Sequence, residues 1–309
     1  MVNISYIDYK SFGRCVEVSN GTIDFVATLD FGPRIIRFGL VGGENEFYED
    51  SDFQISLNSP EFKEKFGSDI GWRIYGGHRL WTSPEGNPRS YYPDNEPVMC
   101  VEIPNGVRLT PPPQKWTNLQ TEIEITISGD NAVDVTHRLT NVGAWGCEAA
   151  IWALSVMAQG GLEVVPQPTL DTGLLHNRIL AVWPYTKMND SRVYWGDKYI
   201  TLRQDKTADC VLKFGINSQH GYAAYFNHGN MFVKYFPVGG ANYPDGGMSF
   251  ETYTNNLMLE IESLGELRVI APGECVSHTE RWQLFGNVER PAVDDENGIA
   301  EILEKFLKI

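Results

Sequence analysis

The sequence lacks any run of 18 apolar residues, and its first ten residues hold no basic segment followed by an apolar one. We therefore expect neither a membrane-spanning segment nor a secretory signal. Cysteines are few, and the five present are scattered without a C-x-x-C spacing. Such a set is typical of reduced thiols rather than of a disulfide framework or a zinc site, which favours a cytoplasmic protein.

Motifs that hold metals and cofactors are also missing. The six histidines show neither an H-x-H nor an H-E-x-x-H spacing. The chain contains no G-x-G-x-x-G, no Walker-type loop and no G-x-S-x-G elbow. We therefore predict that the protein uses no metal and no cofactor.

Positive charge is scarce. The chain has 25 Lys and Arg against 40 Asp and Glu, which gives a net charge of -15. Nucleic acids and anionic membranes require clustered basic residues, so we expect neither as a partner. The charge does not exclude a small neutral ligand. The oligomeric state is expected to be a monomer or a dimer.

Short segments that alternate apolar and polar residues recur through the chain and predict an all-β fold. The segment Thr121 to Ser128 reads TEIEITIS and places three isoleucines on one face. The turn signal Asp130-Asn131 and the returning segment Val133 to Leu139 complete a predicted hairpin. Further strands are predicted at Thr22 to Leu29, Tyr199 to Arg203, Tyr222 to Asn227, Phe232 to Phe236, Leu257 to Ser263 and Ser277 to Phe285.

Helix signals are few. A short turn is predicted over Ser59 to Phe66, and an amphipathic helix over about 295–307, whose apolar face we expect to pack on the sheets. No repeat or linker divides the chain, so residues 1–309 are predicted to form a single large, twisted antiparallel β-sandwich. The hydrophobic fraction of 42% suffices for its core, and some of the 8 Trp are available to line a ligand groove.

Two carboxylates lie in the segment Asn255 to Gly265, which reads NNLMLEIESLG. In a strand, Glu260 and Glu262 face one side with Met258, and apolar residues face the other. Because the surrounding sequence is apolar, the strand is predicted to be central. A carboxylate on a central strand that faces a groove gains basicity from partial desolvation, whereas on an edge strand the pair would only form a solvated face.

Functional groups are dense in the segment Ile74 to Glu85, IYGGHRLWTSPE. Two glycines allow a tight turn, and His78, Arg79 and Trp81 follow directly. A histidine can act as acid or base near neutral pH, an arginine can bind hydroxyls, and an indole can stack on a ligand. A lone histidine is more often structural, but this cluster points to a binding site.

A third segment, Phe232 to Tyr253, places Lys234 among aromatic residues and continues into a glycine-rich loop that carries Asp245. The loop could be a mobile surface feature or the rim of a site that donates hydrogen bonds. Arg34, which follows the breaker Gly32-Pro33, is a further candidate for ligand binding.

Together these segments resemble the galactose mutarotase group. The stretch from Asp134, DVTHRLTNVGAWGCEAAIWALSVMAQGG, resembles its pattern of strand, Leu-Thr-Asn, glycine turn and strand. GGHRL resembles the segment that carries a sugar-contacting histidine in aldose 1-epimerases, and LMLEIES resembles the strand that carries their catalytic glutamate. The motifs GGHRLW, WPYT, YPD and HTERW place the chain near a branch related to these epimerases, and the resemblance covers most of Thr22 to Leu284.

The resemblance implies roles for particular residues. Glu260 matches the general base that takes the proton from the anomeric hydroxyl, and His78 matches the first sugar-binding histidine. The second histidine of the epimerases, which protonates the ring oxygen, is replaced by Trp152 in AIWALSV. An indole is only a hydrogen-bond donor and cannot serve as a general acid.

Three hypotheses follow. In the first, the protein interconverts sugar anomers with Glu260 as base and His78 as acid. Substrate contacts would then come from Arg34, Arg79, Trp81, Trp152, Lys234, Asp245 and Glu262. In the second, it binds or senses a sugar without catalysis, which the presence of Trp152 favours. In the third, it acts on an acidic or phosphorylated sugar held by Arg79 and Lys234.

Overall fold

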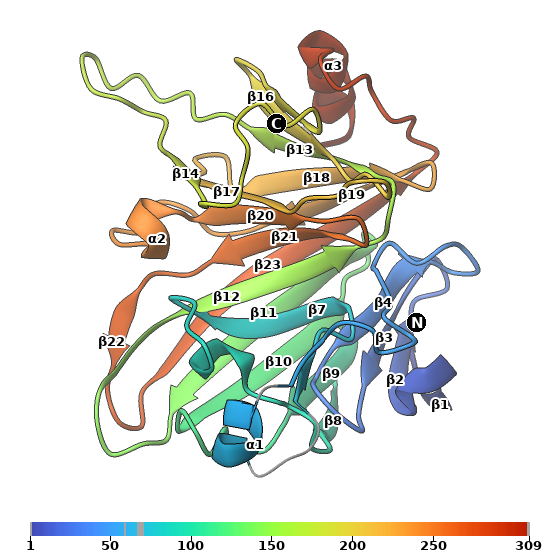
Figure 1. Cartoon of the computed structure of the whole chain (residues 1–309). Coiled ribbons are helices and arrows are strands. Elements are labelled where there is room, and N and C mark those ends of the chain that lie inside the picture. The colour runs from blue at the N-terminus through green and yellow to red at the C-terminus, as the bar shows by residue number, and fades with distance from the viewer. Residues whose placement is uncertain (1, 59, 67–70, 308–309) are drawn as a thin grey trace.

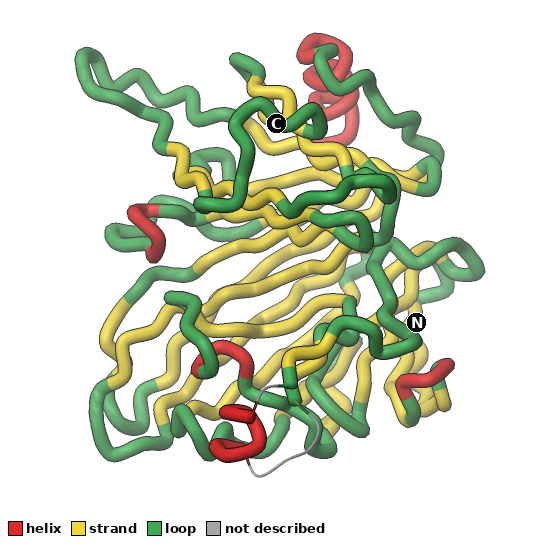
Figure 2. Tube along the Cα trace, in the orientation of Figure 1, coloured by secondary structure: helices red, strands yellow, loops and turns green. Residues whose placement is uncertain are grey.

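The computed structural model describes residues 2–58, 60–66 and 71–307 (Figure 1). Extended strands are the main regular structure, and helices are short and few (Figure 2). The strands form two large antiparallel sheets, and residues from both contribute to one apolar core. This is the all-β sandwich that the alternating segments predicted.

The first sheet is built from the N-terminal strands at one edge and from later strands at its centre and other edge. Short strand β22 (Arg268–Ile270) pairs with one end of β12. The order of its other strands is β1 (Asn3–Asp8), β2 (Arg14–Ser19), β3 (Ile23–Thr28), β4 (Ile35–Leu40), β7 (Gly77–Ser83), β12 (Cys147–Met157), β21 (Leu259–Leu264), β20 (Phe250–Thr254), β17 (Leu212–Ile216) and β14 (Leu180–Val182).

The second sheet contains the predicted hairpin, in which Ile125 lies opposite Val135. A separate two-stranded sheet pairs β5 (Ser56–Leu57) with β6 (Trp72–Arg73). The order of the second sheet is β15 (Val193–Trp195), β16 (Tyr199–Arg203), β13 (Leu162–Pro166), β18 (Tyr222–Asn227), β19 (Asn230–Tyr235), β23 (Cys275–Gly286), β11 (Ala132–Asn141), β10 (Leu119–Ile127), β9 (Gly106–Thr110) and β8 (Met99–Ile103).

The helices are α1 (Pro60–Phe66), α2 (Pro244–Gly247) and α3 (Glu296–Leu307), with short 3-10 turns at Lys10–Phe12 and Arg89–Tyr91. The first confirms the short helical turn predicted before Gly67, although Ser59 lies outside the described residues. Helix α3 confirms the predicted C-terminal helix and buries Ile299 and Leu303 against Leu162 and Ala224 of the second sheet. Within the described ranges, no helix combines the length and apolarity needed to cross a membrane.

Strand β21 lies between β12 and β20, so the prediction that this strand is central is confirmed. Its Leu259 and Ile261 belong to the core between the sheets. Glu260 and Glu262 therefore face the opposite side of the sheet. The register places them beside Tyr253 and Glu251 of β20, respectively.

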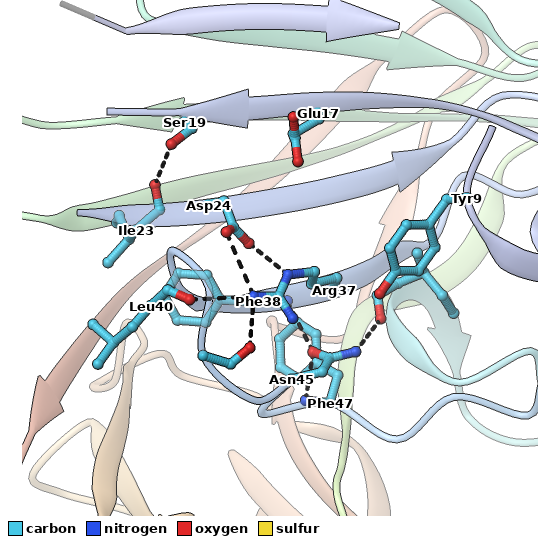
Figure 3. Close-up of polar contacts among 12 residues, drawn as sticks. Tyr9, Glu17, Ser19, Ile23, Asp24, Arg37, Phe38, Leu40, Asn45 and Phe47 are labelled. Atoms are coloured by element: carbon cyan, nitrogen blue, oxygen red, sulfur yellow. Dashed lines mark hydrogen bonds and ion pairs between the residues drawn. The ribbon is translucent and has the colours of Figure 1, made fainter. Parts of the chain in front are cut away.

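A polar cluster fixes the hairpin of β3 and β4, which β7 and β12 separate from β21 in the first sheet (Figure 3). Arg37 Nε donates to Asp24 Oδ1 at 2.7 Å, and Arg37 Nη2 donates to the Leu40 carbonyl at 3.2 Å. The Asn45 side-chain oxygen accepts from the backbone N–H groups of Phe38 and Phe47. These bonds hold the loop that follows β4. Strand β4 itself pairs with β7.

Candidate functional site

Strand β7 divides its side chains between the two faces of the first sheet. Successive residues of a strand point to opposite sides. His78 and Leu80 are buried toward the second sheet, where Leu80 joins the main core. Arg79 and Trp81 lie on the outer face and line a cavity. The outer face of the first sheet therefore carries the candidate site.

Neighbouring strands add to this face in register. Trp152 of β12 lies opposite Trp81, and Leu154 lies opposite Arg79. On the next strands, Lys213 of β17 pairs with Tyr253. The outer face thus brings aromatic rings and charged groups together from several strands.

Two adjoining cavities, together called the groove here, lie over this face and share four lining residues, Glu85, Tyr91, Trp152 and Trp183. The first, of about 420 Å³, is lined mainly by aromatic and aliphatic side chains with a few charged groups, as ligand pockets usually are. The second, of about 490 Å³, is called the acidic pocket and is lined by Leu57, Glu85, Gly86, Asn87, Tyr91, Trp152, Trp183, Asp245 and Glu251.

Aromatic rings form the walls of the first cavity. The rings of Trp72 and Trp81 lie 5.4 Å apart, and those of Trp81 and Trp152 lie 5.3 Å apart. The Arg79 guanidinium sits over the Trp81 ring at 4.1 Å and over the Trp72 ring at 4.9 Å. Flat, rigid faces of this kind suit the apolar face of a pyranose ring.

Glu260 and Arg79 form the charged pair in this cavity. Arg79 Nη2 lies 3.6 Å from Glu260 Oε1. Burial raises the pKa of Glu260 to about 7, although the charge of Arg79 acts to lower it. Burial lowers the pKa of Arg79 to about 10. Glu260 Oε1 and Arg79 Nε and Nη1 have no hydrogen-bond partner. The pair therefore presents a carboxylate with the basicity of a general base and free donors beside it.

A second charged group lies next to the first and centres on Lys213. Its Nζ lies 2.8 Å from Glu251 Oε2 and 3.0 Å from Glu262 Oε2. Burial disfavours the charge of Lys213, but Glu262 and Glu251 outweigh burial and raise its pKa. Trp152 Nε1 donates to Glu262 Oε2 at 2.8 Å. The lysine and the indole are thus held by carboxylates, and neither offers a proton at neutral pH.

Five of the predicted site residues are brought together on this face: Glu260, Glu262, Arg79, Trp81 and Trp152. Asp245 of α2 lies at the acidic pocket, where it accepts a hydrogen bond from Ser83 at 3.5 Å. Arg34 lies apart from the groove. It is buried in an ion pair with Asp94, with Nη1 and Oδ2 2.5 Å apart, so it supports the structure near Trp81 rather than facing the ligand cavity.

The predicted pairing of His78 with Glu260 is wrong, because the two side chains lie on opposite faces of the sheet. His78 is 0% exposed and shares a hydrogen bond of 2.7 Å between its Nε2 and His137 Nε2. His137 Nδ1 donates to the His278 carbonyl, so His78 Nε2 is the donor in this pair. His78 Nδ1 then accepts from Ser155 at 2.9 Å. His78 cannot reach a ligand in the groove.

Lys234 is also in the interior and not at the site, contrary to the prediction. Its Nζ lies 2.7 Å from Glu280 Oε1 and donates to the carbonyls of Ala153 and Ile261 at 2.9 and 3.0 Å. Glu280 further accepts from Ser263 at 2.5 Å and from Trp282 at 3.0 Å. The result is a sealed polar network between the sheets, called the interior network below.

The interior network also contains the one group among the described residues whose ligand atoms converge closely enough for a metal, His78, His137 and Glu280. Lys234 already supplies the positive charge that Glu280 needs. The His137 ring is committed on both sides, because its Nδ1 donates to the His278 carbonyl and its Nε2 accepts from His78. The arrangement fits a structural network better than a cation site.

Sequence reasoning missed several residues of the groove, among them Lys213, Glu251, Trp183 and Tyr185. Lys213 stands inside the apolar segment VLKFGI, and Glu251 stands inside SFETYT. A charged residue within an apolar strand is itself a signal, since it requires a buried partner. Which carboxylates meet which cation depends on the strand order, which the sequence does not give.

A comparison of the sequence with protein-family profiles gives no match, and neither does a comparison with curated proteins. The fold, however, matches solved structures. A TPR-domain-containing protein from Parabacteroides distasonis shares 11% identity with a TM-score of 0.57; the match covers 88% of this chain and only 47% of that protein.

Two further structures match over their whole length. A galactose mutarotase-like protein from Lactobacillus casei has 8% identity and a TM-score of 0.55, with 87% of this chain and 99% of that chain covered. A galactose mutarotase-like protein from Clostridium acetobutylicum has 9% identity and a TM-score of 0.53, with 93% and 98% covered. The chain therefore has the galactose mutarotase-like fold that its motifs predicted.

Proposed function

We propose that this protein binds a sugar in the groove and interconverts its anomers, with Glu260 as the general base. The observation that carries the proposal is the Glu260 carboxyl group: it lines an aromatic cavity, it has an oxygen without a partner, and burial raises its pKa to about 7. The galactose mutarotase-like fold supports the choice of ligand. As part of the proposal, the protein works in the cytoplasm.

In the proposed reaction, Glu260 takes the proton of the anomeric hydroxyl, the carbonyl forms at C1, and the bond from C1 to the ring oxygen breaks. Arg79 replaces His78 beside the ring oxygen. Its Nε and Nη1 are free to donate hydrogen bonds to the developing alkoxide, which then takes a proton from solvent. Rotation about the C1–C2 bond and reversal of these steps close the ring on the other face.

The experiment is anomer exchange measured by NMR on D-galactose, D-glucose and related neutral hexoses, compared with the uncatalysed rate. We expect Glu260→Gln to lower the catalysed rate by about 100-fold or more, since general bases contribute this much. Glu304→Gln on the exposed face of α3 is the matched control and leaves the rate unchanged. Wild-type rates in Glu260→Gln would remove Glu260 from the mechanism.

The second candidate is sugar binding without catalysis. It is favoured by Trp152, whose Nε1 is committed to Glu262, and by the position of His78 on the far side of the sheet. In this case the same sugars bind, with no acceleration of anomer exchange in the wild-type protein. The two candidates are separated by measuring affinity and exchange on one sample.

The groove gives little support to an acidic or phosphorylated sugar. Arg79 faces Glu260, and Lys213 is shared between Glu251 and Glu262. Lys234, expected to meet the anion, lies in the interior network. An anionic ligand would therefore meet more carboxylates than free cations.

A further inference from the structure

The acidic pocket is lined by three carboxylates from three separate segments. Glu85 follows β7, Asp245 belongs to α2, and Glu251 belongs to β20. Among the described residues that line this pocket, none is Lys or Arg. Lys213 lies beside the pocket, and its single charge is divided between Glu251 and Glu262. Arg89 lies next to Gly86 and donates to the Pro84 carbonyl. The pocket therefore keeps an excess of negative charge toward a ligand.

Glu251 is the most deeply placed of the three and is 0% exposed. Its Oε2 faces Lys213 at 2.8 Å, while its Oε1 has no partner. A buried carboxylate oxygen without a donor is unfavourable, and native structures rarely leave one unsatisfied. Glu251 lines the pocket, and burial raises its pKa well above its ordinary value against the charge of Lys213. A cation in the pocket would stabilise the ionised form of this carboxyl.

The carboxylates of the pocket are spread around its wall and do not converge on one point. They are not among the groups of described residues whose ligand atoms lie within 4.8 Å of one another, as a metal ion requires. An organic ammonium, by contrast, carries three donors that can reach carboxylates on different sides. Lys213 Nζ already lies over the rings of Trp152 and Trp183, at 4.5 and 4.7 Å. The ring of Tyr91 adds a further face on which a cation can rest.

We propose that the acidic pocket binds the protonated amino group of an amino sugar, whose pyranose ring lies in the aromatic cavity beside it. This inference rests on the proposed function in one respect, that the groove holds a sugar. It names the class of sugar: Glu251 and Asp245 receive the ammonium, and neutral hexoses bind in the same place without that contact.

The test is a set of binding titrations near neutral pH with matched sugars: D-glucosamine and D-galactosamine, their N-acetyl derivatives, and the parent hexoses. We expect each free amine to bind at least about tenfold more tightly than its N-acetyl and parent partners, as a hydrogen-bonded ion pair allows. The preference decreases as salt is added, because part of the attraction is long-range. Equal affinities for the three partners would overturn the proposal.

Two variants locate the contact. Glu251→Gln keeps the size of the side chain and removes its charge, and Asp245→Asn does the same at an exposed position where folding is not at risk. We expect each to lower the preference for the amine severalfold, because it weakens binding of the amine more than binding of the parent hexose. Glu304→Gln removes one charge from α3 and leaves the preference intact. An unchanged preference in both pocket variants would also overturn the proposal.

Anomer exchange on the same samples separates this proposal from the catalytic one. Preferential binding of amines without accelerated exchange supports the amine pocket and removes the catalytic role of Glu260. Accelerated exchange of neutral hexoses without any preference for amines supports the catalytic role of Glu260 and overturns the amine pocket.

Discussion

The first sheet separates two polar clusters that use the same strands and differ in one respect. In the interior network, the Glu280 carboxylate accepts from Ser263 and Trp282 and is paired with Lys234. In the groove, buried oxygens of Glu260 and Glu251 have no partner. Both clusters are desolvated, so the difference lies in how completely their polar atoms are satisfied.

The comparison shows how to distinguish a site from a structural network when both contain ionisable residues. The polar atoms of His78, His137, Lys234 and Glu280 all have hydrogen-bond or ion-pair partners, so these residues leave nothing for a ligand to supply. Unmet donors and acceptors beside a cavity are stabilised only when something binds there. His78, the more attractive catalytic residue by type, belongs to the first category, and Arg79, its neighbour, belongs to the second.

The largest effect is expected from breaking the interior network. Lys234→Met leaves Glu280 charged and buried without its cation, so the free energy of unfolding should fall by about 3 to 5 kcal/mol. Urea unfolding measures the loss. Lys305→Met on the exposed side of α3 is the control, with a change within about 0.5 kcal/mol. A loss below about 1 kcal/mol in Lys234→Met would mean that the network is less tightly coupled than its contacts indicate.

The next effect concerns the pH dependence of anomer exchange. Glu260, with a pKa of about 7, must be ionised to accept a proton, so the rate should rise about 100-fold from about pH 5 to about pH 8. His137 and His278 contribute nothing in this range, since burial lowers the pKa of each to about 3. A rate that declines through neutral pH would instead identify protonated Glu260 as a donor.

A smaller effect is expected from the aromatic wall. Trp81→Ala removes the ring that lies between Trp72 and Trp152, and sugar affinity should fall about tenfold. The matched control is Trp145→Ala, because Trp145 is 84% exposed and outside the groove. Titration followed by tryptophan fluorescence measures both, and comparable losses in the two variants would argue against stacking at Trp81.

The smallest effect is a gain in stability when a groove charge is removed. The folded-state pKa of Glu260 is raised above the value of about 4.3 for an unfolded glutamate, so the native state holds the proton more tightly. Stability from this group is therefore present at low pH and is lost as pH rises through about 7.

Glu260→Gln does not titrate, so it should exceed wild type by on the order of 1 kcal/mol at about pH 8 and match it near pH 4.5. Unfolding at the two pH values measures the difference. A variant that is less stable than wild type at about pH 8 would show that the pair with Arg79 stabilises the fold.

Local sequence patterns predicted the parts of the fold that depend on neighbouring residues. The alternation in Thr121 to Ser128 and the turn at Asp130-Asn131 sufficed for the hairpin, and apolar residues around Glu260 sufficed to place its strand at the centre. Because successive side chains of a strand point to opposite faces, His78 and Arg79 cannot both face the groove. No strand is predicted for residues 77–83 from their sequence, so the alternation of these side chains between two faces does not follow from it.

The groove itself could not be assembled from the sequence. Lys213 meets Glu251 and Glu262 only because β17, β20 and β21 are adjacent, and no local pattern encodes that order. Lys234 was misplaced for a related reason: its strand belongs to the second sheet, so its side chain enters the interior from the other side.

The five strands of the groove have a consequence for how the protein acquires activity. In chain order they are β7, β12, β17, β20 and β21, and they extend from Gly77 to Leu264. No nascent or truncated chain that ends before β21 contains a complete binding surface. Ligand binding is therefore an all-or-none reporter of a finished sheet, and in a refolding experiment it should return with the slowest long-range pairing rather than with the hairpins.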